Sequence, residues 1–162
     1  MITNKLENIT PEIAEQLLAT NDGGEFLNRP RSASVVAAYA RDMAEGRWKR
    51  THEAVAVYYD KLKKRWILVD GQHRMAAIIA VGKPVELLVA RYGTKQEAME
   101  AIQCVNIGKP RPVSQIGIMT GQVKDNGSAR AAAANKYLQI MNGEDPTKSQ
   151  VLELMSKQQG AL

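Results

Sequence analysis

The sequence has little cysteine, little histidine and no long apolar run, and each scarcity excludes a class of protein or site. Cys104 is the only cysteine among 162 residues, which excludes an intrachain disulfide and a cysteine-based metal cluster. No apolar run is long enough to cross a membrane and no signal peptide is recognisable, so we expect a cytoplasmic protein without a membrane partner. Histidine chemistry is limited to His52 and His73.

The composition that remains is that of a globular protein. Hydrophobic residues make up 44% of the chain and charged residues 24%, which is typical of a folded domain rather than a disordered one. The length suits one domain with a small addition. Lys and Arg number 22 against 17 Asp and Glu, which gives a net charge of +5. A mildly basic chain is compatible with nucleic acid or nucleotide phosphates but does not require them.

The most informative stretch covers residues 66–79. Four apolar residues, 66–69, predict a short buried strand. Met75, Ile78 and Ile79 then repeat at helical spacing, and Gly82 predicts the end of that helix. Between the two elements lies a compact polar segment, which we call the box: Asp70, Gly71, Gln72, His73 and Arg74.

The box has two interpretations. A strand that passes through a glycine into a helix leaves unpaired N–H groups at the turn, where the helix dipole favours an anion and Arg74 adds a positive fork. The crowding of Gln, His and Arg in one turn favours a phosphate site. The alternative is a tight turn whose polar side chains only cap the helix.

The flanking patterns predict the order of elements. The first is a helix over residues 10–20 with Thr10 as N-cap and Ile13 and Leu18 on its apolar stripe. Ser34 is the expected cap of a second helix, which Gly46 ends. Strands follow over 55–59 and 66–69, joined by a turn at 60–64, and a third strand covers 85–92. Thr94 caps a helix through Gln103 that turns Ala98, Ala101 and Ile102 inward.

Gly71-Gln72-His73-Arg74, followed by two alanines, resembles the Gly-Glu-Arg-Arg box of the partition protein ParB and the Gly-Cys-His-Arg box of sulfiredoxin. Residues 70–74 match the Asp-Gly-Gln-His-Arg variant of that superfamily in phage, plasmid and bacterial proteins. The order hairpin, box, helix, glycine, strand, helix extends the resemblance over roughly residues 27–111. Gln72 stands where sulfiredoxin has its catalytic cysteine, so sulfiredoxin-type reductase chemistry is not expected.

The resemblance implies a ParB/sulfiredoxin-like α/β (mixed α+β) fold, a small sheet with packed helices. We expect this domain over residues 1–112, with the helix 10–20 packed on it, and a helical C-terminal subdomain over 113–162. In that subdomain a short helix is expected over 114–120. A longer one from Ser128 turns Ala134, Tyr137, Leu138 and Met141 to one face, and a last one carries Val151 and Met155. No dense basic recognition helix is found there, so packing or a homodimer through these helices is expected.

Further site residues follow from the resemblance. Arg29 and Arg31 match a basic loop of ParB, and Asn106 matches the asparagine of its second box. Val105 stands where ParB has an acid that serves the nucleotide's metal, so metal-dependent CTP chemistry does not carry over. Lys109 and Arg111 are candidates to close over phosphates, and an exposed connector or solvated loop is the alternative for these basic stretches. The phosphate-binding set is Gly71, Gln72, His73, Arg74, Arg29, Arg31, Asn106, Lys109 and Arg111.

The leading function is a nucleotide-binding, DNA-associated protein of phage or plasmid type with slow NTP hydrolysis or nuclease activity. Asp70 is the candidate ligand of Mg²⁺ bound with an NTP, and Asp70, His73 and Glu53 are the catalytic candidates. Since adjacent residues on a strand point to opposite faces, His52 and Glu53 are expected to diverge. Double-stranded DNA contact is assigned to the predicted hairpin and its approach: Lys61, Lys63, Lys64, Arg65, Arg47, Lys49 and Arg50. The alternatives are a non-catalytic inhibitor or transcriptional regulator with a vestigial or switch pocket, and a small-molecule kinase of the same superfamily.

Overall fold

The fold was obtained as a computed structural model, in which residues 1–26, 28, 30–102 and 127–159 are described. The chain divides into two compact units, Met1–Ile107 and Gly108–Leu162. Strands and helices occur together in the first unit, and helices alone occur in the described part of the second. The predicted mixed α+β class is therefore confirmed.

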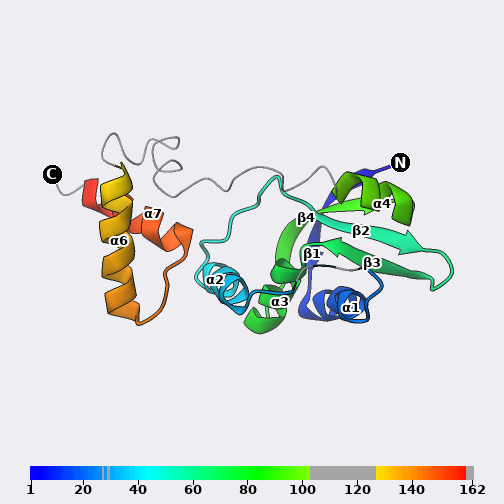
Figure 1. Cartoon of the computed structure of the whole chain (residues 1–162), viewed down its shortest axis with the longest axis horizontal. Helices are drawn as coiled ribbons and strands as arrows, with labels where there is room; N and C mark the ends of the chain where they lie inside the picture. The colour runs from blue at the N-terminus through cyan, green and yellow to red at the C-terminus, as the bar shows by residue number, and fades with distance from the viewer. Residues whose placement is uncertain (27, 29, 103–126, 160–162) are drawn as a thin grey trace. The chain divides into compact units, whose positions relative to one another are not determined.

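The first unit is built on a four-stranded mixed sheet with the order β1-β4-β2-β3 (Figure 1). Strand β1 (Thr3–Ile9) pairs antiparallel with β4 (Val85–Tyr92), and β4 runs parallel to β2 (Val55–Asp60). Strand β3 (Arg65–Asp70) pairs antiparallel with β2 at the other edge of the sheet. The chain thus returns from β3 to the far side of β2 through a crossover, and that crossover starts with the box.

Helices cover both faces of this sheet (Figure 1). Helices α1 (Pro11–Asp22) and α3 (Gln72–Val81) pack on one face, and α2 (Ala33–Ala44) packs against α3. The main core lies between these helices and the sheet, and its fully buried members include Val55, Leu68, Met75 and Ile78. On the opposite face, the short helix α4 (Lys95–Ile102) covers a smaller cluster that contains Tyr58, Ile67, Val69 and Ala98.

The elements around the box were predicted correctly. The hairpin turn lies between Asp60 and Arg65, and Asp60 Oδ1 accepts hydrogen bonds from the N–H groups of Leu62 (2.9 Å) and Lys63 (3.1 Å). Helix α3 ends at Gly82, whose φ of +68° is the left-handed value that favours glycine. Thr10 and Thr94 accept hydrogen bonds from main-chain N–H groups at the starts of α1 and α4, as expected of N-caps.

The prediction that a helix comes first was wrong, because β1 precedes it. The segment Thr3–Ile9 has no run of β-branched or aromatic residues, and only Ile9 is buried. It is an edge strand whose seven residues are all in register with residues 85–91 of β4. Its conformation depends on a strand about eighty residues later, which local sequence patterns do not report.

Two local details also differ from the prediction. The N-cap of α2 is Ser32 rather than Ser34; the Ser32 hydroxyl accepts from Val35 N–H at 3.4 Å and contacts the Ser34 hydroxyl at 2.9 Å. Helix α1 buries Ala14 and Leu18, whereas Ile13 is 40% exposed. The apolar stripe of α1 is therefore rotated toward Ala14, because an alanine permits close packing on the core.

The second unit contains a pair of helices, α6 (Gly127–Asn142) and α7 (Lys148–Gln159). Ala134, Val151 and Met155 form its small core, with Leu138 at the margin. Tyr137 and Met141, which were predicted to share one face with Ala134 and Leu138, are more than half exposed and do not belong to this core. Thr147 and Gln150 cap α7 reciprocally through side chain and main chain, at 2.8 and 3.2 Å. The helix predicted over 114–120 lies outside the described residues.

Among the helices in the described ranges, none is long and apolar enough to span a membrane.

Candidate functional site

The box forms the junction between β3 and α3. Gly71 has a φ of +110°, and a Cβ atom at this position would lie 3.0 Å from Val55 Cγ2 on the neighbouring strand. Only glycine therefore fits this turn without strain. Asp70 Oδ1 accepts a hydrogen bond from Gly71 N–H at 2.8 Å, which fixes one oxygen of its carboxylate beside the turn.

Arg74 is directed into the protein rather than out of the turn. It is only 8% exposed, and its guanidinium donates to the carbonyl oxygens of Glu53 (2.5 Å) and Ala54 (3.0 Å). Asp70 Oδ2 lies 3.9 Å from the same guanidinium. A phosphate that used this fork would have to displace the two carbonyl groups. In the structure, Arg74 instead fixes the loop that leads into β2.

Gln72 and His73 join α3 to the two preceding helices. The Gln72 side-chain oxygen accepts a hydrogen bond from Asn21 at the end of α1 (3.1 Å). His73 Nε2 accepts from the main-chain N–H of Ser32, the N-cap of α2, at 3.0 Å. As an acceptor, Nε2 carries no proton. All three long side chains of the box thus make internal hydrogen bonds.

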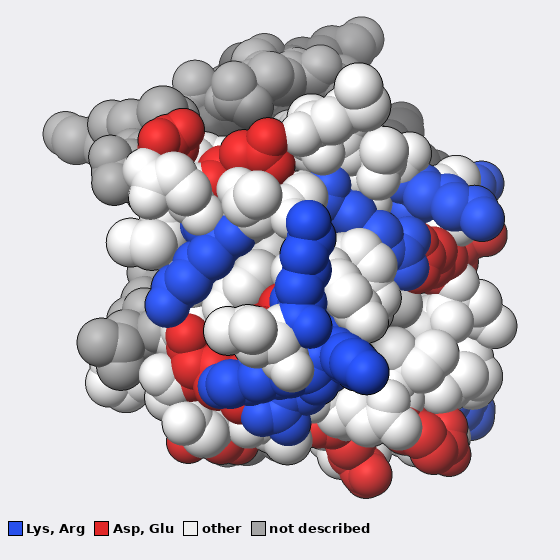
Figure 2. Space-filling model, turned by 90° about the vertical axis from the view of Figure 1, so that its right-hand side faces the viewer, with Lys and Arg blue, Asp and Glu red and all other residues white. Residues whose placement is uncertain are grey.

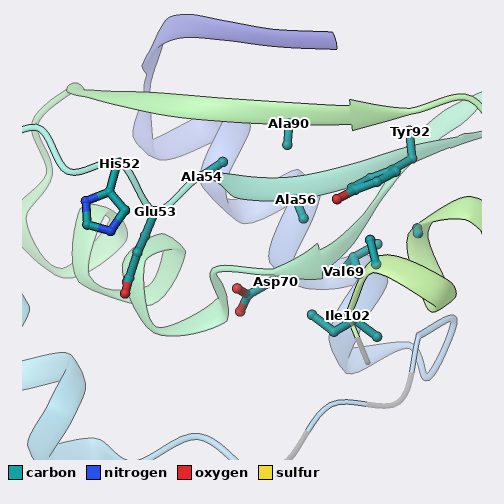
Figure 3. A pocket seen from close by; sticks show the side chains of 11 residues that line it. His52, Glu53, Ala54, Ala56, Val69, Asp70, Ala90, Tyr92 and Ile102 are labelled. Carbon is teal, nitrogen blue, oxygen red and sulfur yellow. The ribbon is translucent and has the colours of Figure 1, made fainter. Parts of the chain in front are cut away.

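A cavity of about 340 Å³ lies beside the box, on the face of the sheet that α4 covers. The sheet contributes its floor and α4 its wall, while the loop before β2 and the end of β3 form its rim. Figure 3 shows Glu53 and Asp70 toward one end and Tyr92, Val69 and Ile102 toward the other. The lining residues are His52, Glu53, Ala54, Ala56, Val69, Asp70, Ala90, Tyr92, Ala98, Ala101 and Ile102.

The rim brings two of the catalytic candidates to one cavity. Glu53 and Asp70 both line it, whereas His73 is not among its described lining residues and bonds to the start of α2. The expectation that His52 and Glu53 diverge was wrong, because they precede β2 in a loop and both line the cavity. Strand alternation does not apply to that loop, whose path Arg74 fixes through two carbonyl groups.

The described residues contain no group of three His, Cys, Asp or Glu side chains that would hold a metal ion without further ligands. The two rim carboxylates nevertheless suit Mg²⁺, which proteins bind through one or two carboxylates together with substrate phosphates and water. Asp70 and Glu53 are the residues that would hold it.

The other predicted phosphate ligands divide into two groups. Arg31 is described, and it makes a two-pronged ion pair with Asp22 at the end of α1. This ion pair lowers the pKa of Asp22 below its ordinary value. Arg29, Asn106, Lys109 and Arg111 lie outside the described residues.

Several lining residues were not considered as site residues from the sequence. The inward turn of Ala98, Ala101 and Ile102 was predicted, but not that a cavity lies beneath them. Ala56 and Ala90 lie opposite each other on β2 and β4, and this pairing needs the strand order. The only local signal was the presence of alanines among bulkier residues in the strands. The small side chains of these alanines leave space above the sheet.

The predicted DNA-binding cations are largely neutralised by acidic neighbours. Arg47 pairs with Asp42 and Glu45, Arg50 with Glu86, and Lys63 and Arg65 with Glu25. Within the described part of the chain, Lys49, Lys61 and Lys64 have no ion pair. Figure 2 shows Lys and Arg side chains gathered at the hairpin end of the protein, with Asp and Glu between them.

Comparisons with known proteins do not assign this site. No family model matches the sequence, and no curated protein or solved structure matches it either.

Proposed function

We propose that this protein binds a nucleotide in the cavity beneath α4 and acts in association with DNA. The observation that carries the proposal is the position of the cavity, whose rim contains Asp70 of the box and Glu53 beside it. Its volume of about 340 Å³ is within the range of small-molecule sites. The resemblance of the box to ParB-like proteins supports the same ligand class.

The parts of the site have separate roles in this proposal. The apolar floor and Tyr92 accept the base, and the phosphates extend to the rim at the start of α3. Mg²⁺ bound with the phosphates would neutralise their charge beside Asp70 and Glu53. Arg74 acts as a positioning residue, because it fixes the rim loop through the carbonyl groups of Glu53 and Ala54.

Hydrolysis is expected to be slow. The rim offers two carboxylates but no lysine or arginine among the described lining residues to stabilise the charge of a transferring phosphoryl group. We expect turnover well below the median of about 10 s⁻¹ for enzymes. A phosphate-release assay with Mg²⁺ or Mn²⁺ measures it; turnover near that median would contradict this assignment of roles.

Binding is tested by a thermal-shift screen with ATP, CTP, GTP, UTP and the dNTPs in Mg²⁺, followed by calorimetric titration. Ala101→Phe places a ring in the cavity from α4 and should weaken the best nucleotide at least tenfold. Ala80→Phe, on an exposed position of α3, is the matched control and should bind as the wild type does. Unchanged binding by Ala101→Phe would remove the cavity from the site.

The internal bonding of the box favours a second candidate, a non-catalytic interaction protein such as an inhibitor or a transcriptional regulator. Gln72, His73 and Arg74 all serve to hold neighbouring segments in place. In that case the box is structural, and the screen gives no thermal shift with any nucleotide.

A further inference from the structure

Much of the α4 cavity is lined by small or apolar side chains. Ala56 and Ala90 are register partners on adjacent strands and form part of its floor. Ala98 and Ala101 face the cavity from α4, and Tyr92 contributes an aromatic ring at one end (Figure 3). Side chains that stop at Cβ leave a slot whose surfaces can contact both faces of a planar ring.

The polar end of the cavity has the opposite character to a phosphate site. Glu53 and Asp70 carry negative charge, and the described lining residues include no lysine or arginine. The nearest arginine of the box, Arg74, is 8% exposed and bonded to two carbonyl groups. A phosphate without a metal ion would therefore face two carboxylates, one of them already paired with Arg74, and no lysine or arginine among the described lining residues, so the Coulomb term is repulsive.

The rim carboxylate oxygens that accept no hydrogen bond from a described residue suit hydroxyl donors. No described residue bonds to the Glu53 carboxylate, and Asp70 uses Oδ1 for Gly71 N–H while Oδ2 lies 3.9 Å from Arg74. An ionised carboxylate only accepts hydrogen bonds. Acidic side chains bind ribose hydroxyls in this way in dinucleotide-binding folds.

We propose that the cavity recognises the ribonucleoside half of its ligand, with the base in the alanine-lined slot and the ribose hydroxyls donating to Glu53 and Asp70. This inference rests on the proposed nucleotide-binding function. It states that the base and the ribose provide the binding affinity. The ribose hydroxyls then take the Glu53 and Asp70 carboxylates that would otherwise hold the metal ion, so the phosphates are accepted as a Mg²⁺ complex completed by water and add no affinity of their own.

The test compares ligands that share one base: the ribonucleoside, its 2′-deoxy counterpart, and the NTP in EDTA or in Mg²⁺, each by calorimetric titration. The ribonucleoside should bind at least as tightly as the metal-free NTP. Loss of the 2′-hydroxyl should weaken binding about tenfold, as expected for one hydrogen bond to a charged group.

Variants that remove a carboxylate charge separate the recognition of the ribose from the repulsion of the phosphates. Glu53→Gln and Asp70→Asn should reduce the preference for ribose and strengthen the binding of metal-free NTP. Glu15→Gln, which makes the same charge change on the exposed side of α1, should alter neither.

The outcomes distinguish this inference from the function on which it rests. Tighter binding of metal-free NTP than of the nucleoside, or equal binding of ribose and deoxyribose forms, would overturn the inference and leave nucleotide binding intact. If neither nucleosides nor nucleotides bind, the proposed function fails as well.

Discussion

The guanidinium of Arg74 influences the cavity only through the loop that it holds. Its two hydrogen bonds satisfy the carbonyl groups of Glu53 and Ala54, and the residue is nearly buried. An arginine in the first turn of a helix looks like a phosphate ligand in sequence, since the sequence does not show which carbonyl groups the fold brings near it. Arg74, which follows β3 in sequence, therefore determines the conformation of the loop that precedes β2.

Replacing Arg74 by alanine should destabilise the protein. The change leaves two carbonyl oxygens without their charged donor, and a hydrogen bond to a charged group contributes about 1.5–3 kcal/mol. We expect the free energy of unfolding, measured in urea, to fall by about that amount. Arg74→Lys should recover only part of the loss, because one ammonium lacks the planar fork.

Arg50→Ala is the control for Arg74. Arg50 is 63% exposed in its side chain and pairs with Glu86 on the surface. Its loss should change the free energy of unfolding by no more than about 0.5 kcal/mol. Equal stability of the two variants would show that the carbonyl contacts of Arg74 do not matter.

The ion pair between Asp22 and Arg31 makes stability depend on pH. Arg31 lowers the pKa of Asp22 below its ordinary 3.8, mainly through the hydrogen bond. A lowered folded-state pKa gives stability that is present above the unfolded-state pKa and is lost as pH falls through the folded-state pKa. Both side chains are partly exposed, so the gain is expected to be about 0.2–1 kcal/mol.

NMR titration of the Asp22 carboxyl group checks this effect. Arg31→Gln should raise the pKa of Asp22 toward its ordinary value, and Arg50→Gln should not change it. The stability difference between wild type and Arg31→Gln should be present at neutral pH and should be lost as the pH falls below 3.8, through the lowered folded-state pKa of Asp22. A nucleotide that raises the pKa of Asp22 in the wild type would show that Arg31 moves to the ligand.

At the scale of elements, the turn from β3 to α3 depends on Gly71. Gly71→Ala forces an L side chain into a φ of +110° and places its Cβ 3.0 Å from Val55 Cγ2. Backbone strain of this kind costs about 1–3 kcal/mol. We expect a greater loss than for Gly82→Ala, whose added Cβ meets nothing within 4 Å.

A double-mutant cycle with Val55→Ala separates the two contributions to that loss. Removing the Val55 methyl groups should lessen the cost of Gly71→Ala, while the backbone strain remains. Urea unfolding of the four proteins measures both. If the cost is the same in both backgrounds, the contact between the added Cβ and Val55 is not its cause.

Much of the fold around the box could be predicted because its signals are local. The hairpin turn, the glycine at the end of α3 and the threonine caps each depend on residues within a few positions. Strand β1 could not be predicted, since its support is distant: Glu7 makes a two-pronged ion pair with Arg91 of β4, and Arg91 lies over the ring of Trp66 on β3 at 5.0 Å.

The candidate site was predictable to a similar, limited extent. The box and the choice of Asp70 as a candidate follow from a short motif, and Glu53 was identified as an acid near the start of β2. The cavity itself depends on strand order, which places Ala56 next to Ala90, and on α4 crossing above them. The roles of Gln72 and His73 depend on contacts that lie 51 and 41 residues away in sequence, respectively.

At the scale of the whole molecule, the net charge of +5 does not show which cations can contact nucleic acid. Four of the seven predicted DNA-binding residues are paired with Glu25, Asp42, Glu45 or Glu86. A cation already paired with a carboxylate contributes little to phosphate binding, because the acid competes and is left near the DNA. Lys49, Lys61 and Lys64 are the residues that remain.

Duplex DNA binding, if it uses these three lysines, should therefore be weak and follow a log–log salt slope of about −3, as counterion release predicts for three phosphates. Fluorescence anisotropy over a range of salt concentrations measures the slope. Lys61→Glu with Lys64→Glu should flatten it toward −1 and leave nucleotide affinity unchanged, since neither residue lines the α4 cavity. The charge-matched control, Lys5→Glu with Lys83→Glu, changes exposed positions away from the hairpin and should retain the wild-type slope. Equal effects of the two pairs would mean that only the total charge matters, and the hairpin would then lose its assigned role in DNA contact.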